Sequence, residues 1–266
     1  MIDSKKRIAI IGGGNMGGAI AKGLIKSGMV LPGQITVTRR TADALRPFSE
    51  MGANVTTDNV EAVKGADIVV FALKPYLILN VIEELKGDLP KDALFISVAT
   101  GIGIQQLENA LGTGSAIVRA MPNTAAEVSE SVTALVVKNT TTEQEQLATD
   151  IFSKLGLALI VDEALMPAIT ALASCGIAHA LRFIRAMMEA GIEMGLTSKQ
   201  SAQIAAQTAK GAAQLILTNG SHPEVEVDKV CTPKGVTITG INEMEHAGFT
   251  SAVIKGIMGS YNKIVK

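Results

Sequence analysis

The first 161 residues alternate between short apolar runs and longer stretches in which apolar residues recur every three or four positions. Short apolar runs are typical of parallel strands buried on both faces, and the longer stretches are typical of the helices that connect them. The pattern predicts about eight strands, at 7–11, 35–38, 54–56, 66–73, 94–98, 116–120, 132–138 and 157–161. Helices are expected between them, including 42–51, 77–85, 104–111 and 143–155. The fold class is therefore α/β, with a Rossmann-type doubly wound sheet at the N-terminus.

The pattern changes at Asp162, where strand signals stop. Helical runs follow at 163–195, 198–219, 236–247 and 249–264, and alanine and glycine recur along them. Helices with small side chains pack closely and need another surface to cover them. We therefore predict a nucleotide-binding domain at 1–162 and an all-helical dimerisation domain at 163–266, with two chains packed together through the second.

A glycine-rich turn joins the first strand to the first helix. Gly12, Gly14 and Gly17 have the spacing that lets a chain reverse, a pyrophosphate approach bare backbone, and a helix press onto a strand. The free N–H groups and the dipole of the following helix favour an anion. This turn predicts a dinucleotide site that also includes Asn15 and Met16. The alternative is a glycine-rich turn that only packs a strand against a helix.

The end of the second strand indicates which dinucleotide binds. An NAD site usually has an acidic residue there, whereas this chain has Thr38, Arg39, Arg40 and Thr41. Guanidinium groups and hydroxyls are suited to a 2′-phosphate. We therefore predict NADPH, with NADH binding more weakly. The alternative is a pair of solvated arginines at the start of a surface helix.

Other candidate cofactor contacts lie where later strands end, because cofactors cross the carboxyl edge of such sheets. These contacts are Asn59, Ala72, Leu73, Lys74, Ala99, Gly101 and Asn123.

Charge and composition narrow the partners to small molecules and further copies of the chain. The net charge is −1 with no basic or acidic block, so neither nucleic acid nor a membrane is expected as a partner. Cys175 and Cys231 lack metal-ligand spacing, so we expect no metal, and a reduced cytoplasmic setting. No targeting segment is expected. The apolar stretch 164–181 contains Pro167 and His179, and we interpret it as a helix buried at an oligomer interface.

The chain resembles the pyrroline-5-carboxylate reductase family over nearly its whole length. The resemblance is carried by the segments 11–16, 72–75, 119–124 and 230–238, of which the last two are the most specific. It implies NAD(P)H-dependent reduction of 1-pyrroline-5-carboxylate to L-proline, the last step of proline biosynthesis. It also implies an interlocked homodimer, often assembled into a decamer.

The resemblance places the substrate between the cofactor and a loop before a late helix. Thr237 is the implied catalytic hydroxyl near the imine nitrogen, and Thr232, Lys234, Gly235 and Val236 line the loop. A proline, a glycine and hydroxyls directly before a helix also form an anion site suited to a carboxylate. The alternative for Thr237 is an ordinary helix cap.

This chain departs from the family pattern on the substrate side. The segment 174–179 replaces Gly-Ser-Gly-Pro-Ala-Tyr, and Lys234 replaces the first glycine of the loop. Ala125 and Ser129 replace a proline and a glycine. Lys234 either contacts a carboxylate, obstructs the pocket or is solvated. His179 on an apolar helix is interpreted as a hydrogen-bonded core histidine in preference to a catalytic acid.

Three other functions remain open from the sequence. One is a reductase of another cyclic imine, and another is a catalytically silent NADP-binding protein. A β-hydroxyacid dehydrogenase is disfavoured because its long helix carries a catalytic lysine, whereas this one offers His179, Arg182 and Arg185.

Overall fold

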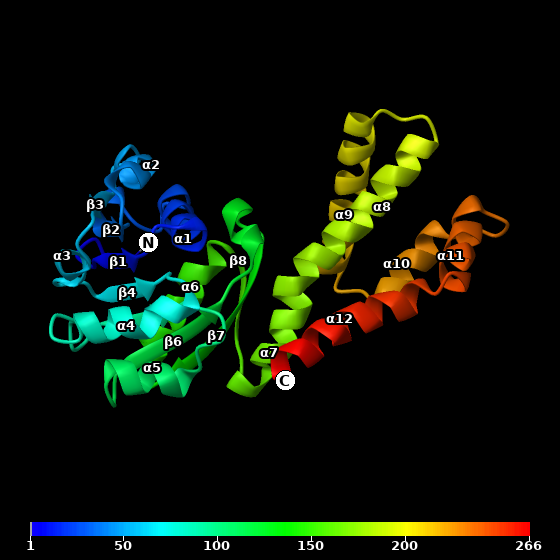
Figure 1. The fold of residues 1–266 in the computed structure, drawn as a ribbon. Coiled ribbons are helices and arrows are strands. Elements are labelled where there is room, and N and C mark those ends of the chain that lie inside the picture. Colours follow the sequence, from blue (N-terminus) through cyan, green and yellow to red (C-terminus); the bar gives the residue numbers. More distant parts are fainter. Residues whose placement is uncertain (1) are drawn as a thin grey trace. The chain divides into compact units, whose positions relative to one another are not determined.

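The computed structural model describes residues 2–266 and divides the chain into two compact units (Figure 1). The first unit ends at Ser174 and contains a single eight-stranded sheet in the order β3-β2-β1-β4-β5-β6-β7-β8. Its strands are β1 (Ile8–Ile11), β2 (Ile35–Thr38), β3 (Asn54–Thr56), β4 (Ile68–Phe71), β5 (Leu94–Ser97), β6 (Ala116–Met121), β7 (Ser131–Lys138) and β8 (Gly156–Ile160). All neighbours are parallel except β6 and β7. The predicted Rossmann-type sheet is confirmed.

The strand order reverses between β1 and β4, the usual position of the ligand crevice in such sheets. All four residues of β1 are buried, because helices cover both faces of the sheet. Ile8 and Ile10 pack under α1 (Asn15–Lys26), α2 (Arg46–Ser49) and α6 (Thr142–Ser153). Ala9 and Ile11 pack on the opposite face under α3 (Asn59–Val63), α4 (Pro75–Leu85) and α5 (Ile104–Leu111).

Two short segments differ from the predicted single helix at 42–51. The chain forms a 3₁₀ turn, η2 (Ala42–Leu45), followed by the four-residue helix α2. Pro47 lies at the start of α2, where proline is tolerated because that N–H has no intrahelical partner. Two further 3₁₀ turns, η1 (Pro32–Gln34) and η3 (Thr124–Val128), precede β2 and β7.

The predicted helical run at 163–195 is divided into four elements. They are the 3₁₀ turn η4 (Glu163–Leu165), α7 (Met166–Ile169), the π-helical turn η5 (Thr170–Ser174) and α8 (Cys175–Glu193). The first three belong to the sheet unit. Glu163 anchors this segment, because its Oε1 accepts hydrogen bonds from Arg119 Nη1 on β6 at 2.6 Å and from Ile104 N at 2.8 Å. The division after Ser174 differs from the predicted boundary after residue 162.

The second unit, Cys175–Lys266, is entirely helical. It contains α8, α9 (Ser198–Asn219), α10 (Pro223–Val230), α11 (Val236–His246) and α12 (Phe249–Val265). Only Gly191, Ser201 and Ala205 are buried in it, whereas Met194 is 77% exposed and Leu217 is 74% exposed. A helical unit with so little buried surface is typical of one whose apolar side chains are covered by a partner.

The pattern of apolar residues does not predict α10. Its Glu226 carboxylate accepts hydrogen bonds from Lys229, Ser221 and Asn219. These bonds lower the pKa of Glu226 to about 2, so they persist until strongly acidic pH. Helix α10 is therefore held at its N-terminal end by polar side chains that bind the Glu226 carboxylate. Its C-terminal end leads directly into the loop before α11.

Candidate cofactor and substrate sites

The glycine turn after β1 has the geometry of a phosphate cradle. Gly12 has a φ of 104°, and a methyl group in its place would lie 2.6 Å from the Ala72 carbonyl oxygen. At Gly17 an added methyl would collide with the Gly12 carbonyl. At Gly14, by contrast, no atom lies within 4 Å of an added methyl, so its backbone faces open space at the start of α1. The turn is thus tightly packed at Gly12 and Gly17, and it is open to solvent at Gly14, where a pyrophosphate would approach.

Thr38 holds this turn against the end of β2. Its Oγ1 accepts a hydrogen bond from Gly12 N at 3.2 Å, and its carbonyl accepts one from Gly13 N at 2.7 Å. Thr38 is 2% exposed, so its hydroxyl is not free for a phosphate as the sequence suggests. Its structural role is to fix the position of the glycine loop.

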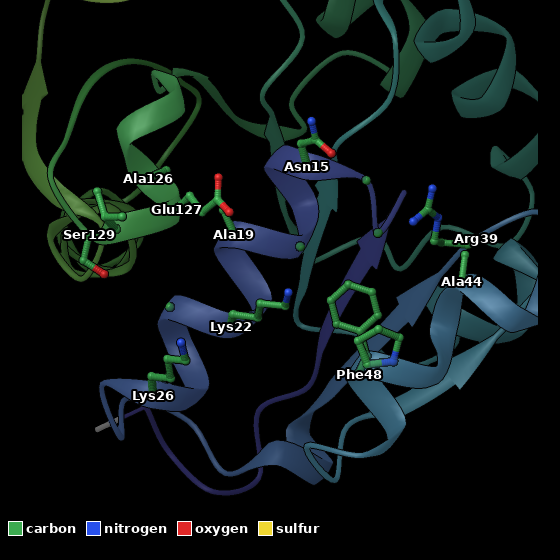
Figure 2. A pocket seen from close by; sticks show the side chains of 16 residues that line it. Asn15, Ala19, Lys22, Lys26, Arg39, Ala44, Phe48, Ala126, Glu127 and Ser129 are labelled. Carbon is green, nitrogen blue, oxygen red and sulfur yellow. The ribbon is translucent and has the colours of Figure 1, made fainter. Parts of the chain in front are cut away.

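Arg39 and Arg40 are both exposed directly after β2. The aliphatic part of the Arg39 side chain lies next to Gly13. A methyl group added at Gly13 would lie 3.2 Å from the Cγ of Arg39. Arg39 also lines a pocket of about 660 Å³ with Gly13, Gly14 and Asn15 (Figure 2). The structure therefore brings the glycine turn and one of the two predicted phosphate-binding arginines to the same cavity.

The remaining predicted cofactor contacts lie mostly at strand ends of the same sheet. Ala72, Leu73 and Lys74 follow β4 beside Gly12, and Lys74 is exposed at the N-cap of α4. Ala99 is buried and Gly101 is exposed, with a φ of 82°, after β5. Asn59 begins α3, whose cap is Asp58, and Met16 is half-buried in the first turn of α1.

Asn123 is fully engaged within the sheet unit. Its Oδ1 accepts a hydrogen bond from Ala125 N at 3.0 Å, and its Nδ2 donates to the Ala173 carbonyl at 3.2 Å. It is 5% exposed. The Ala173 carbonyl belongs to the π-helical turn η5. Asn123 therefore ties the loop after β6 to the segment that leads into the helical unit.

The loop before α11 forms a tight turn. Gly235 N donates to the Thr232 carbonyl at 2.9 Å, and a methyl at Gly235 would lie 2.5 Å from Thr232 Oγ1. Gly235 is the N-cap of α11, and no acidic residue lies in the first turn. Thr237 is half-buried and is the second residue of α11. It is therefore not the helix cap, and the helix-cap alternative for this residue is wrong. The side chain of Val236 is 90% exposed.

Lys234 and Ser129 share an unusual backbone conformation. Their φ angles are 62° and 61°, in the left-handed region that favours glycine. Both are positions at which the sequence departs from a glycine of the resembled family. Each side chain is exposed, so the strain at these two positions of this chain comes from the backbone conformation and not from packing.

We predict that Lys234→Gly and Ser129→Gly each raise the free energy of unfolding by about 0.5–1 kcal/mol, because left-handed backbone is costly for a residue with a Cβ. Chemical denaturation at fixed protein concentration measures this change. Asn139→Gly is the matched control, since Asn139 has a φ of 54° but asparagine tolerates this region. Destabilisation by both glycine variants would contradict the interpretation.

His179 does not fit its predicted role. Its Nδ1 is buried without a hydrogen-bond partner among residues 2–266, as is Ser174 Oγ. The prediction of a hydrogen-bonded core histidine is therefore wrong for that nitrogen.

Two other predictions concern charged and metal-binding side chains. Arg185 forms an ion pair with Glu189, with 2.9 Å between Nε and Oε1. No cluster of metal-ligating side chains occurs in the described part of the chain.

The sequence reading missed Lys22 and Phe48 as lining residues of the α1 pocket. One signal was present: Asn15, Ala19, Lys22 and Lys26 follow one another at helical spacing along the exposed side of α1 (Figure 2). No sequence pattern indicates that Phe48 lines the pocket. Its contacts with Gly13 and Gly18 depend on the tertiary packing of distant segments.

A doubly wound sheet with an open phosphate cradle at its switch point defines a dinucleotide-binding α/β protein. The model of pyrroline-5-carboxylate reductase dimerisation matches residues 163–266, and that of the coenzyme F420-dependent NADP oxidoreductases matches 7–101. The chain belongs to the pyrroline-5-carboxylate reductase family and carries its dimerisation domain.

Curated relatives and solved structures agree with this assignment. The chain is 40% identical to pyrroline-5-carboxylate reductase 2 of Dictyostelium discoideum, covering 100% of this chain and 94% of that protein. It is 36% identical to the enzyme of Escherichia coli over 98% of both. It spans about half (49%) of pyrroline-5-carboxylate reductase 1 of D. discoideum, at 41% identity over 96% of this chain.

Among solved structures, the pyrroline-5-carboxylate reductase of Coxiella burnetii superposes with a TM-score of 0.92 at 35% identity, covering 98% of this chain and 97% of that one. The enzyme of Plasmodium falciparum, solved with NADP bound, superposes at 0.85 with 26% identity and the same coverages.

One helical run, Glu163–Glu193, is long and apolar enough to cross a membrane. It lies at the start of the region that matches the dimerisation model.

Proposed function

We propose that this protein catalyses the NADPH-dependent reduction of the C=N bond of 1-pyrroline-5-carboxylate to L-proline. The observation that carries this proposal is the open backbone at Gly14, in one pocket with the exposed Arg39 and without a carboxylate at the end of β2. Family membership supplies the substrate class. NADPH, when bound, supplies the hydride for the imine carbon.

The chain's own residues would bind and orient the two reactants. The N–H groups at the start of α1 and the Arg39 and Arg40 side chains would hold the pyrophosphate and the 2′-phosphate, respectively. The N-terminus of α11, with Gly235 as its cap, would bind the carboxylate. Thr237 would orient the imine nitrogen, which takes one proton from water as its carbon gains one hydride from the cofactor.

We propose that the dimerisation domain places the Thr232–Thr237 loop at a cofactor-binding domain within a homodimer. The near absence of buried residues in the helical unit supports assembly. Two further parts of the proposal are assembly of the dimers to a decamer and residence in the cytoplasm. The proposal also includes no nucleic-acid or membrane partner.

We predict that the protein is never a stable monomer at working concentrations, because separation would expose the apolar side chains of α8 to α12. Sedimentation velocity across a dilution series measures this. A folded and active species of 27.7 kDa would contradict the prediction.

The substrate is tested by following NADPH oxidation with 1-pyrroline-5-carboxylate beside 1-pyrroline-2-carboxylate. We expect turnover of the first and little of the second, because moving the carboxylate changes which ring atoms meet the loop. Preference for the second would indicate another cyclic-imine reductase, and cofactor binding without turnover of any imine would indicate a silent NADP-binding protein.

A further inference from the structure

The pocket beside α1 extends beyond the glycine turn and the arginine that sequence motifs identify. It continues along α1 past Gly18 and Ala19 to Lys22, and it is bounded on one side by Ala44 and Phe48. Figure 2 shows Lys22 extending from the middle of α1 on the side of Phe48. The cavity is thus shared by Arg39, which follows β2, and by a lysine of α1.

Phe48 holds the Lys22 ammonium in this position. The Lys22 Nζ lies 5.9 Å from the centre of the Phe48 ring, within the range of a cation–π interaction. The ring is itself fixed, because Phe48 is 4% exposed and packs against Gly13 and Gly18. Lys22 therefore stands over a rigid support that is attached to the phosphate loop.

The charges in the pocket are unbalanced. Arg39, Lys22 and Lys26 line it together with one carboxylate, that of Glu127. None of these four side chains forms an ion pair with another side chain in the described residues 2–266. Glu127 comes from η3, on the flank of α1 opposite Phe48 (Figure 2). The half of the pocket nearer Arg39 is thus positively charged and lacks an acidic partner.

We propose that Lys22 is a second cationic determinant of specificity for the cofactor's 2′-phosphate, acting with Arg39. The proposal rests on the proposed function, in which NADPH binds at the glycine turn. A phosphate monoester carries nearly two negative charges at neutral pH. Of the two arginines after β2, Arg39 lines this pocket and Arg40 does not, so within the pocket the Arg39 guanidinium alone leaves part of that charge unpaired. Lys22 supplies the second positive charge from α1, and Phe48 reduces the entropy lost when the lysine is ordered.

The proposal is tested by calorimetric binding to the full-length protein of adenosine 2′,5′-bisphosphate, adenosine 5′-monophosphate, NADP⁺ and NAD⁺. We expect Lys22→Met to weaken the binding of the two ligands that carry a 2′-phosphate by about three- to fivefold, the upper part of the range of an exposed ion pair. The other two ligands should change by less than about twofold, and the salt dependence of NADP⁺ binding should become shallower. Lys22→Arg should retain most of the affinity.

Lys26→Met is the matched control, because Lys26 lies one turn further along the same side of α1, away from Phe48 (Figure 2). It should leave the preference for 2′-phosphate unchanged. Equal loss for all four ligands, no loss for any, or an equal effect of Lys26→Met would overturn the proposal. If Arg39→Ala abolishes the preference while Lys22→Met does not, the cofactor assignment stands and the role of Lys22 fails. If the unaltered protein shows no preference for 2′-phosphate, both fail.

Discussion

Thr237→Ala is expected to lower kcat for 1-pyrroline-5-carboxylate by about 10- to 1000-fold while NADPH binding stays unchanged. The loss is bounded because a hydroxyl is one of several orienting contacts, and hydride transfer to an imine requires no strong protein acid. In the structure Thr237 is half-buried and Gly235 caps α11 in its place, so removal of the hydroxyl takes away no helix cap. Steady-state kinetics and a separate NADPH titration measure the two effects.

Thr237→Ser is the control, since it restores the hydroxyl and should recover most of the activity. If Thr237→Ala has no effect on kcat, the carried-over site is wrong for this chain, and the proposed substrate fails with it. A loss of NADPH binding would instead show that the substitution acts outside the substrate site.

Lys234→Gly separates the three roles open to Lys234 once its effect on stability is known. A lysine that contacts the substrate carboxylate should, when removed, raise KM and leave kcat nearly unchanged. A lysine that obstructs the pocket should, when removed, improve kcat/KM. No change in either parameter would identify it as a solvated charge, in agreement with its exposed side chain.

Arg39→Ala is expected to weaken NADPH binding by about 10- to 100-fold and to leave NADH nearly unchanged. The guanidinium would pair with a phosphate that NADH lacks, and charge-assisted hydrogen bonds are worth about 1.5–3 kcal/mol. The salt dependence of NADPH affinity should also become shallower. Arg46→Ala is a suitable control, because Arg46 is exposed on α2 and pairs with Glu50 at 2.7 Å. Equal loss for both cofactors would contradict the assignment.

The features that depend on local sequence could be predicted from it. Buried strands such as β1 and the glycine turn after it follow from the order of apolar residues and glycines, because the same residues that pack also set the turn. Helix α9 begins and ends at the predicted residues, with Thr197 as its cap and Gly220 following it in a left-handed conformation.

Features that depend on contacts between distant segments could not be predicted. The Thr38 hydroxyl accepts a hydrogen bond from Gly12 N. The Asn123 side chain donates one to the carbonyl of Ala173, which lies 50 residues away in the chain. The π-helical turn η5 has no marker in a run that reads as continuous helix. Helix α10 was missed because it is short and begins at a clasp formed by Glu226, Ser221 and Asn219, not at an amphipathic repeat.

The most direct test of the central claim is to locate the transferred hydrogen with NADPH that carries deuterium at both C4 positions of the nicotinamide, so that transfer from either face of the ring delivers deuterium. With 1-pyrroline-5-carboxylate as substrate, the account predicts L-proline carrying one deuterium at C5, the former imine carbon, detected by mass spectrometry and NMR. L-Proline without deuterium at C5, or NADPH oxidation without formation of proline, would contradict it.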